Sequence, residues 1–144
     1  MLLKRIIDLR DEYNLTQEKM AEVLGVKKST YGRWETDEIF ISLWHLNDLC
    51  NYFEVSMDYM IGISDIKCYK LVNDKLNNEL IGKRLKEFRI SKNLTQEELA
   101  NSLNTTQSVI SDYENGKTRI LTAFAYEIVI KYNISLDWLC GRID

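Results

Sequence analysis

The chain has 144 residues, of which 45% are hydrophobic and 28% are charged, and its formal net charge is −3 at pH 7. No apolar run approaches the length of a membrane span, and the first residues lack the apolar core of a secretory signal peptide. The three cysteines, Cys50, Cys68 and Cys140, are odd in number and have no CxxC spacing. We therefore expect a cytoplasmic protein with reduced thiols, no disulfide framework and no metal site.

The charge is unevenly divided between the two halves. Residues 1–66 hold 7 Lys or Arg against 12 Asp or Glu, a net charge of −5, whereas residues 67–144 hold 12 against 10, a net charge of +2. This balance excludes a general polycation, so any anionic partner must be bound by a local basic patch.

The sequence contains an internal repeat. Residues 4–65 align with residues 83–144 without a gap, at an offset of 79. The pentapeptide Asn14-Leu15-Thr16-Gln17-Glu18, for example, returns as Asn93-Leu94-Thr95-Gln96-Glu97. A unit of roughly 65 residues is large enough to fold alone. We predict two domains, residues 1–65 and 80–144, joined by a linker at 66–79 that is either extended or partly helical.

Each repeat predicts helices joined by short turns, since the chain has no proline and only six glycines. The first helix presents apolar residues at i, i+4 and i+7 spacing, which are Leu2, Ile6 and Leu9 in one copy and Ile81, Leu85 and Phe88 in the other. Thr16 and Thr95 are expected to cap the second helix, and Glu98 completes a capping box in the second copy alone. Gly25 and Asn104 follow that helix and tolerate the left-handed conformation of a tight turn.

A third helix is predicted at residues 28–35 and 107–114, only three or four residues after the second. This spacing is typical of a helix-turn-helix, in which the second helix of the pair enters a DNA major groove. A fourth helix is expected to start near Ser42 or Thr122, and a fifth at Ser56 or Ser135.

Both repeats resemble the Cro/C1-type (XRE-like) helix-turn-helix family of phage repressors and bacterial regulators. The resemblance rests on Leu15-Thr16-Gln17-Glu18 and Trp34-Glu35 in the first copy, and on Leu94-Thr95-Gln96-Glu97-Glu98 and Tyr113-Glu114-Asn115-Gly116-Lys117 in the second. It implies an all-α fold of two tandem five-helix, lambda-repressor-like domains. It also implies structural ion pairs between Arg10 and Glu35 and between Arg89 and Glu114, each joining the first helix to the third.

The resemblance also implies which residues contact DNA bases. Carried over position by position, they are Lys28, Ser29 and Arg33 in the first copy and Gln107, Ser108, Ser111 and Asp112 in the second. Lys28 and Arg33 donate to guanine, Gln107 suits adenine, and Asp112 accepts only from a donor such as cytosine N4. The two copies are therefore expected to prefer different half-sites.

The resemblance also implies phosphate contacts from the start of the second helix and from the loop after the third. The residues at these places are Thr16, Gln17, Thr95, Gln96, Asn115, Lys117 and Arg119, and Lys27, directly before the third helix, is also expected to contact phosphate. The corresponding loop of the first copy carries Asp37 and Glu38, two carboxylates where a cation would suit DNA. The first copy therefore has the cationic reading helix and the second copy has the more suitable phosphate loop, and we expect neither to bind DNA tightly alone.

The fourth helix of the second copy is apolar nearly all round. Ala125, Ile128 and Val129 are expected in the core, which leaves Phe124, Tyr126 and Ile130 for contact with the other copy or with a second chain. A homodimer or a protein partner bound through this helix is therefore expected, the alternative being that the linker covers it.

No nucleophile with a base, no glycine-rich phosphate loop and no metal cluster is visible in the sequence, so we expect neither an enzyme nor a cofactor. The function predicted is a sequence-specific, double-stranded DNA-binding transcriptional regulator, a repressor, that has no membrane partner. The alternative is an antitoxin-like or adaptor protein in which one or both domains serve protein–protein interaction.

Overall fold

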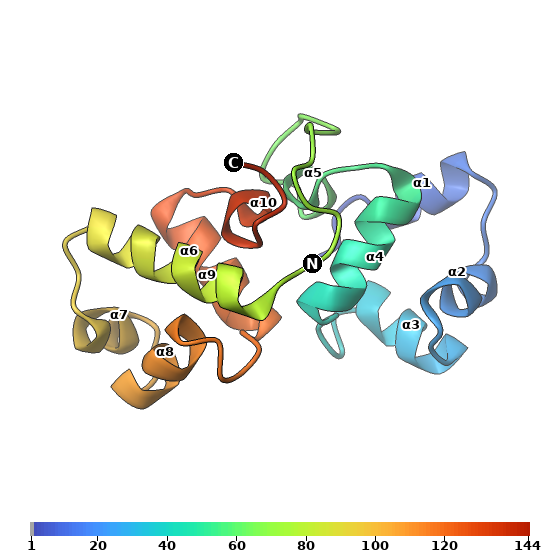
Figure 1. The fold of residues 1–144 in the computed structure, drawn as a ribbon. Helices are drawn as coiled ribbons and strands as arrows, with labels where there is room; N and C mark the ends of the chain where they lie inside the picture. Colours follow the sequence, from blue (N-terminus) through green and yellow to red (C-terminus); the bar gives the residue numbers. More distant parts are fainter. Residues whose placement is uncertain (1) are drawn as a thin grey trace. The chain divides into compact units, whose positions relative to one another are not determined.

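The structure is a computed structural model that describes residues 2–144 (Figure 1). All regular secondary structure in these residues is helical, which confirms the all-α prediction. The chain divides into two compact units, one that runs to Tyr69 and one from Lys70 to Asp144. No helix within residues 2–144 is long and apolar enough to cross a membrane.

Residues 2–69, the described part of the first domain, form five helices. They are α1 (Ile6–Glu12), α2 (Gln17–Leu24), α3 (Lys28–Glu35), α4 (Leu43–Phe53) and α5 (Met57–Met60). Leu2 lies before α1 rather than on it, so its assignment to the helix was wrong, yet it is 3% exposed and belongs to the core. The residues before α1, which include a turn at Lys4-Arg5, thus supply part of the apolar face that the spacing had assigned to a helix.

The second domain repeats the order of the first. Its helices are α6 (Asn78–Ser91), α7 (Gln96–Ser102), α8 (Gln107–Glu114), α9 (Thr122–Tyr132) and α10 (Leu136–Leu139). The helix α6 is twice as long as α1, with 14 residues against 7. Asn77 begins it early, because the Asn77 side chain accepts a hydrogen bond from the Leu80 amide at 3.1 Å.

The local signals for the helix ends are confirmed. Thr16 and Thr95 cap α2 and α7, and the reciprocal hydrogen bonds of a capping box join Thr95 to Glu98. Gly25 and Asn104 adopt the left-handed conformation, with φ angles of 67° and 54°. The turns that they help to form are short, so that α2 packs on α3 and α7 packs on α8 (Figure 1).

Candidate nucleic-acid interface

The pairs α2–α3 and α7–α8 have the connectivity of a helix-turn-helix, and the sequence determines which face of the second helix is exposed. Tyr31 and Trp34 of α3, like Ile110 and Tyr113 of α8, are at most 7% exposed. These apolar side chains hold one side of each helix in its domain core. The polar side chains on the remaining surface are therefore available to a ligand.

On α3 the three residues predicted to read bases are all exposed. Lys28 and Ser29 lie in its first turn, and Arg33 lies near its end. Arg33 Nε donates to Glu38 Oε2 at 3.1 Å, and both side chains are more than half exposed. An exposed pair of this kind contributes about 0–1 kcal/mol. A nucleic acid can therefore displace Glu38 from Arg33 at small cost.

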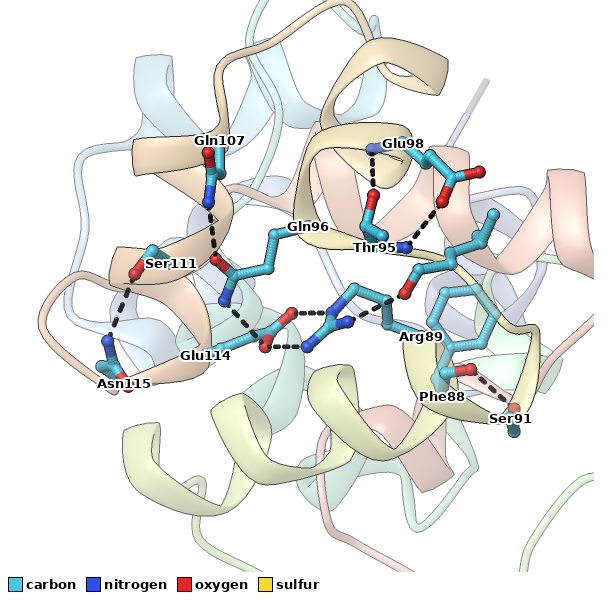
Figure 2. A network of polar contacts seen from close by, with 11 residues as sticks. Phe88, Arg89, Ser91, Thr95, Gln96, Glu98, Gln107, Ser111, Glu114 and Asn115 are labelled. Carbon is cyan, nitrogen blue, oxygen red and sulfur yellow. Dashed lines mark hydrogen bonds and ion pairs between the residues drawn. The ribbon is translucent and has the colours of Figure 1, made fainter.

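On α8 the predicted residues divide into two groups. Gln107 and Ser108 are exposed, whereas Ser111 and Asp112 are half-buried. Ser111 Oγ accepts a hydrogen bond from Asn115 Nδ2 at 3.3 Å, which ties the helix to the loop that follows it (Figure 2). Gln107 and Ser108 are thus the more accessible pair on this helix.

A chain of polar contacts joins Gln107 to the interior of the second domain (Figure 2). Gln107 Nε2 donates to Gln96 Oε1 at 3.4 Å, and Gln96 Nε2 donates to Glu114 Oε1 at 3.2 Å. Glu114 in turn accepts two hydrogen bonds from Arg89, at 2.7 and 3.0 Å. The exposed amide of Gln107 is thereby oriented by a buried ion pair.

The predicted Arg–Glu ion pairs are present in both domains. Arg10 binds Glu35 with the same two hydrogen bonds, at 2.7 and 3.0 Å, and Gln17 Nε2 donates to Glu35 at 3.1 Å. Burial acts to raise the pKa of Glu35, but the hydrogen bond from Arg10, with smaller contributions from Tyr31 and Gln17, outweighs it and holds that pKa below its ordinary value. The hydrogen bond to Glu35 raises the pKa of Arg10. Both groups are therefore charged at neutral pH.

The residues predicted to contact phosphate lie in two different environments. Thr16, Lys27, Thr95, Asn115, Lys117 and Arg119 are exposed. The two glutamines, Gln17 and Gln96, are half-buried, and their amide nitrogens are bound to Glu35 and Glu114. Sequence reasoning missed this link, although a signal for it existed: Arg, Gln and Glu recur at the same spacing in both repeats.

Two further residues that sequence reasoning missed support the end of α8. Asn78 Nδ2, at the start of α6, donates to the carbonyl of Gly116 at 2.7 Å. One turn later, a Cβ atom added to Gly82 would lie 2.6 Å from the carbonyl oxygens of both Tyr113 and Glu114. The helix α6 therefore approaches the backbone of α8 as closely as only glycine allows.

Replacing Gly82 by alanine should destabilise the second domain by about 1–3 kcal/mol, because two backbone carbonyls must move to admit the methyl group. This loss exceeds the gain of about 1 kcal/mol that alanine brings to a helix interior. Urea unfolding of the full chain, followed at the indole resonance of Trp138, measures the effect.

The matched control is Gly32→Ala on α3, where the added Cβ would lie 3.3 Å from Gln17 Oε1, an atom of a flexible side chain. The stability of its first domain, followed at Trp34 and Trp44, should stay within about 1 kcal/mol of the parent. Equal losses in the two variants would contradict the close approach of α6 to α8.

The three residues predicted to form an interface on α9 differ in exposure. Phe124 is half-buried and stacks edge-on against Tyr113 of its own domain, with ring centroids 5.7 Å apart. Tyr126 is half-buried, and Ile130 is 51% exposed. Ile130 is thus the most accessible apolar side chain of the three.

Comparison with known proteins agrees with this architecture. The chain is similar to the uncharacterized HTH-type transcriptional regulator YobD of Bacillus subtilis (strain 168), with 37% identity over 65 residues. The matched segment is 45% of this chain and 58% of that protein. No solved structure matches the chain. The helix-turn-helix family profile matches twice, over residues 6–60 and 85–139, which correspond to the two five-helix units. The chain therefore belongs to the helix-turn-helix family, and it carries the family's domain twice.

Proposed function

We propose that the chain is a double-stranded DNA-binding transcriptional regulator, a repressor, that reads one half-site with α3 and another with α8. The observation that carries the proposal is that both helices expose polar side chains at the positions that a helix-turn-helix presents to base edges. Membership of the helix-turn-helix family supports it, as does the likeness to an HTH-type transcriptional regulator.

The two domains would read different sequences. Lys28 and Arg33 are donors only, which suit the O6 and N7 acceptors of guanine. Gln107 both donates and accepts, which suits the N6 and N7 groups of adenine. Each good bidentate contact discriminates against a wrong base by about 1–3 kcal/mol. The preferred operator therefore consists of two unlike half-sites.

The phosphate contacts would also be shared unequally. The loop after α8 holds Asn115, Lys117 and Arg119, all exposed, close to where a phosphate chain would pass. In the first domain the corresponding loop carries Asp37 and Glu38, and Glu38 already binds Arg33. The second domain would therefore supply most of the affinity, and the first would add discrimination.

Selection of random duplex DNA by the purified full-length chain tests this function. The parent should enrich two unlike half-sites joined in one site. Lys28→Ala/Arg33→Ala should lose one half-site and Gln107→Ala the other, whereas the exposed controls Lys4→Ala and Asn101→Ala should lose neither. Failure to enrich any site at low salt would overturn the proposal.

A second candidate function is a protein-binding adaptor of the antitoxin type, and Ile130 is the observation that favours it. This isoleucine is 51% exposed on a helix whose other apolar residues are largely covered. The dependence of binding on salt separates the two candidates. Binding to DNA through six phosphates would weaken about a thousandfold between 50 and 200 mM salt, whereas an apolar protein contact would change little.

A further inference from the structure

The segment between the two domains is held to each of them by hydrogen bonds. On the side of the first domain, the Ser56 amide donates to the carbonyl of Lys67 at 2.7 Å, and Ser56 Oγ donates to the carbonyl of Ile66 at 3.0 Å. Tyr69 Oη donates to Asp58 Oδ2 at 3.0 Å. Ser56, which caps α5, and Asp58 in the first turn of that helix are both at most 2% exposed. The segment is therefore attached to a buried corner and not to a mobile side chain.

The other end of the segment is attached to the second domain by the residues that follow α10. The Val72 amide donates to the carbonyl of Arg142 at 2.8 Å, and Asn73 Nδ2 donates to the carbonyl of Gly141 at 3.0 Å. Gly141 and Arg142 follow α10 as Gly62 and Ile63 follow α5. Between the attached residues Tyr69 and Val72, Lys70-Leu71 has no recorded hydrogen bond to the described residues 2–144.

The number of linker residues that are not attached to either domain determines how far apart the two domains can move. A flexible linker of fourteen residues would have an end-to-end distance of about 20 Å and would adapt to many arrangements. A free segment of two residues spans at most about 7 Å. Because both ends are held by hydrogen bonds, the free part of the linker is only two residues long, although the linker has fourteen residues in the sequence.

We propose that residues 66–73 act as a spacer that restricts which half-site spacings the chain can occupy with both domains at once, with Tyr69 and Asn73 as positioning residues. The inference rests on the proposed function, since it concerns how two DNA-reading domains act together. When a tether matches the span between two sites, binding of the second domain becomes intramolecular and the affinity rises by about 10²–10⁴. A short tether gives this gain at few spacings, whereas a long one gives a smaller gain at many.

The experiment measures the affinity of the full chain for the selected operator with 0 to 10 base pairs inserted between its half-sites. The parent should lose about tenfold or more at all but a few spacings. A variant with six Gly-Ser residues inserted between Lys70 and Leu71 should bind more weakly at the best spacing and lose less at the others. Tyr69→Phe and Asn73→Ala should flatten the profile in the same direction, while binding to a single half-site stays unchanged in all variants.

Backbone order parameters of the DNA-free protein test the attachment independently. The amides of Lys67 and Val72 should have order parameters near the value of about 0.85 that is typical of rigid backbone. Values below about 0.6 would overturn the spacer even if DNA is bound. Equal affinity of the parent at every spacing would also overturn it, and would leave the proposed function intact. Absence of DNA binding in every variant, with ordered amides, would overturn the proposed function and with it the role of the spacer on DNA.

Discussion

Replacing Arg89 by alanine is expected to destabilise the second domain by about 3–5 kcal/mol, because the Glu114 carboxylate is then left buried without its counter-ion. The Glu114 side chain is 2% exposed, and it receives two hydrogen bonds from Arg89. The Gln96 amide is neutral and cannot compensate for the charge. Urea unfolding of the full chain reports this loss through Trp138, since the other two tryptophans, Trp34 and Trp44, belong to the first domain.

Two control variants isolate the ion pair from other effects of the substitution. Lys86→Ala removes an exposed cation from the same helix, α6, and should change the free energy of unfolding by less than about 0.5 kcal/mol. Arg10→Ala breaks the equivalent pair with Glu35 and should shift the unfolding of the first domain, leaving the Trp138 transition in place. An Arg89→Ala protein as stable as its parent would show that the pair does not hold α6 to α8.

The Arg89→Ala substitution should also change DNA recognition by the second domain. Arg89 fixes Glu114, which fixes Gln96, which contacts Gln107 on the exposed face of α8 (Figure 2). Under conditions where the weakened domain is still folded, Arg89→Ala should reduce selection of the half-site assigned to Gln107. Selection through Lys28 and Arg33 should persist, because these residues lie in the other domain.

The sequence was sufficient where structure depends on near neighbours. The bounds of α3 and α8 were predicted to the residue, although neither helix has a side-chain cap, because an apolar stripe and a short preceding turn each act within one or two turns of helix. Because each of these sequence signals occurs in both repeats, the assignment of the helices did not depend on a single pattern. The Arg–Glu pairs, 25 residues apart, came only from the resemblance.

The sequence did not predict contacts that involve neither periodic nor repeated residues. Asn77 and Asn78 precede the repeated segment, so comparison of the two copies says nothing about them. The close approach of Gly82 to α8 joins residues about thirty positions apart and involves backbone atoms that are the same in every residue. The attachment of the linker is similar, since Val72 and Arg142 meet through their main chains.

Replacing Arg142 by isoleucine is expected to destabilise the second domain by about 3–5 kcal/mol, although isoleucine is the residue at the matching position of the first domain, Ile63. Arg142 Nε donates to Asp137 Oδ1 at 2.9 Å, and the two side chains are 1% and 0% exposed. In the first domain the matching aspartate, Asp58, instead accepts a hydrogen bond from Tyr69. The substitution therefore copies the apolar residue without the hydroxyl that accompanies it.

The second substitution Asp137→Asn, added to Arg142→Ile, decides whether the buried charge causes the loss. A neutral amide costs less to bury than a carboxylate that has lost its counter-ion, so the double variant should recover at least about 1 kcal/mol of the loss. Lys92→Ala, an exposed cation of the same domain, serves as the control and should stay within about 0.5 kcal/mol of the parent in urea unfolding followed at Trp138. A single Arg142→Ile variant as stable as the parent would contradict the argument, because Asp137 would then tolerate burial without its arginine. If the loss is found, the corner that receives Val72 and Asn73 depends on this ion pair, and the attachment of the linker depends on it too.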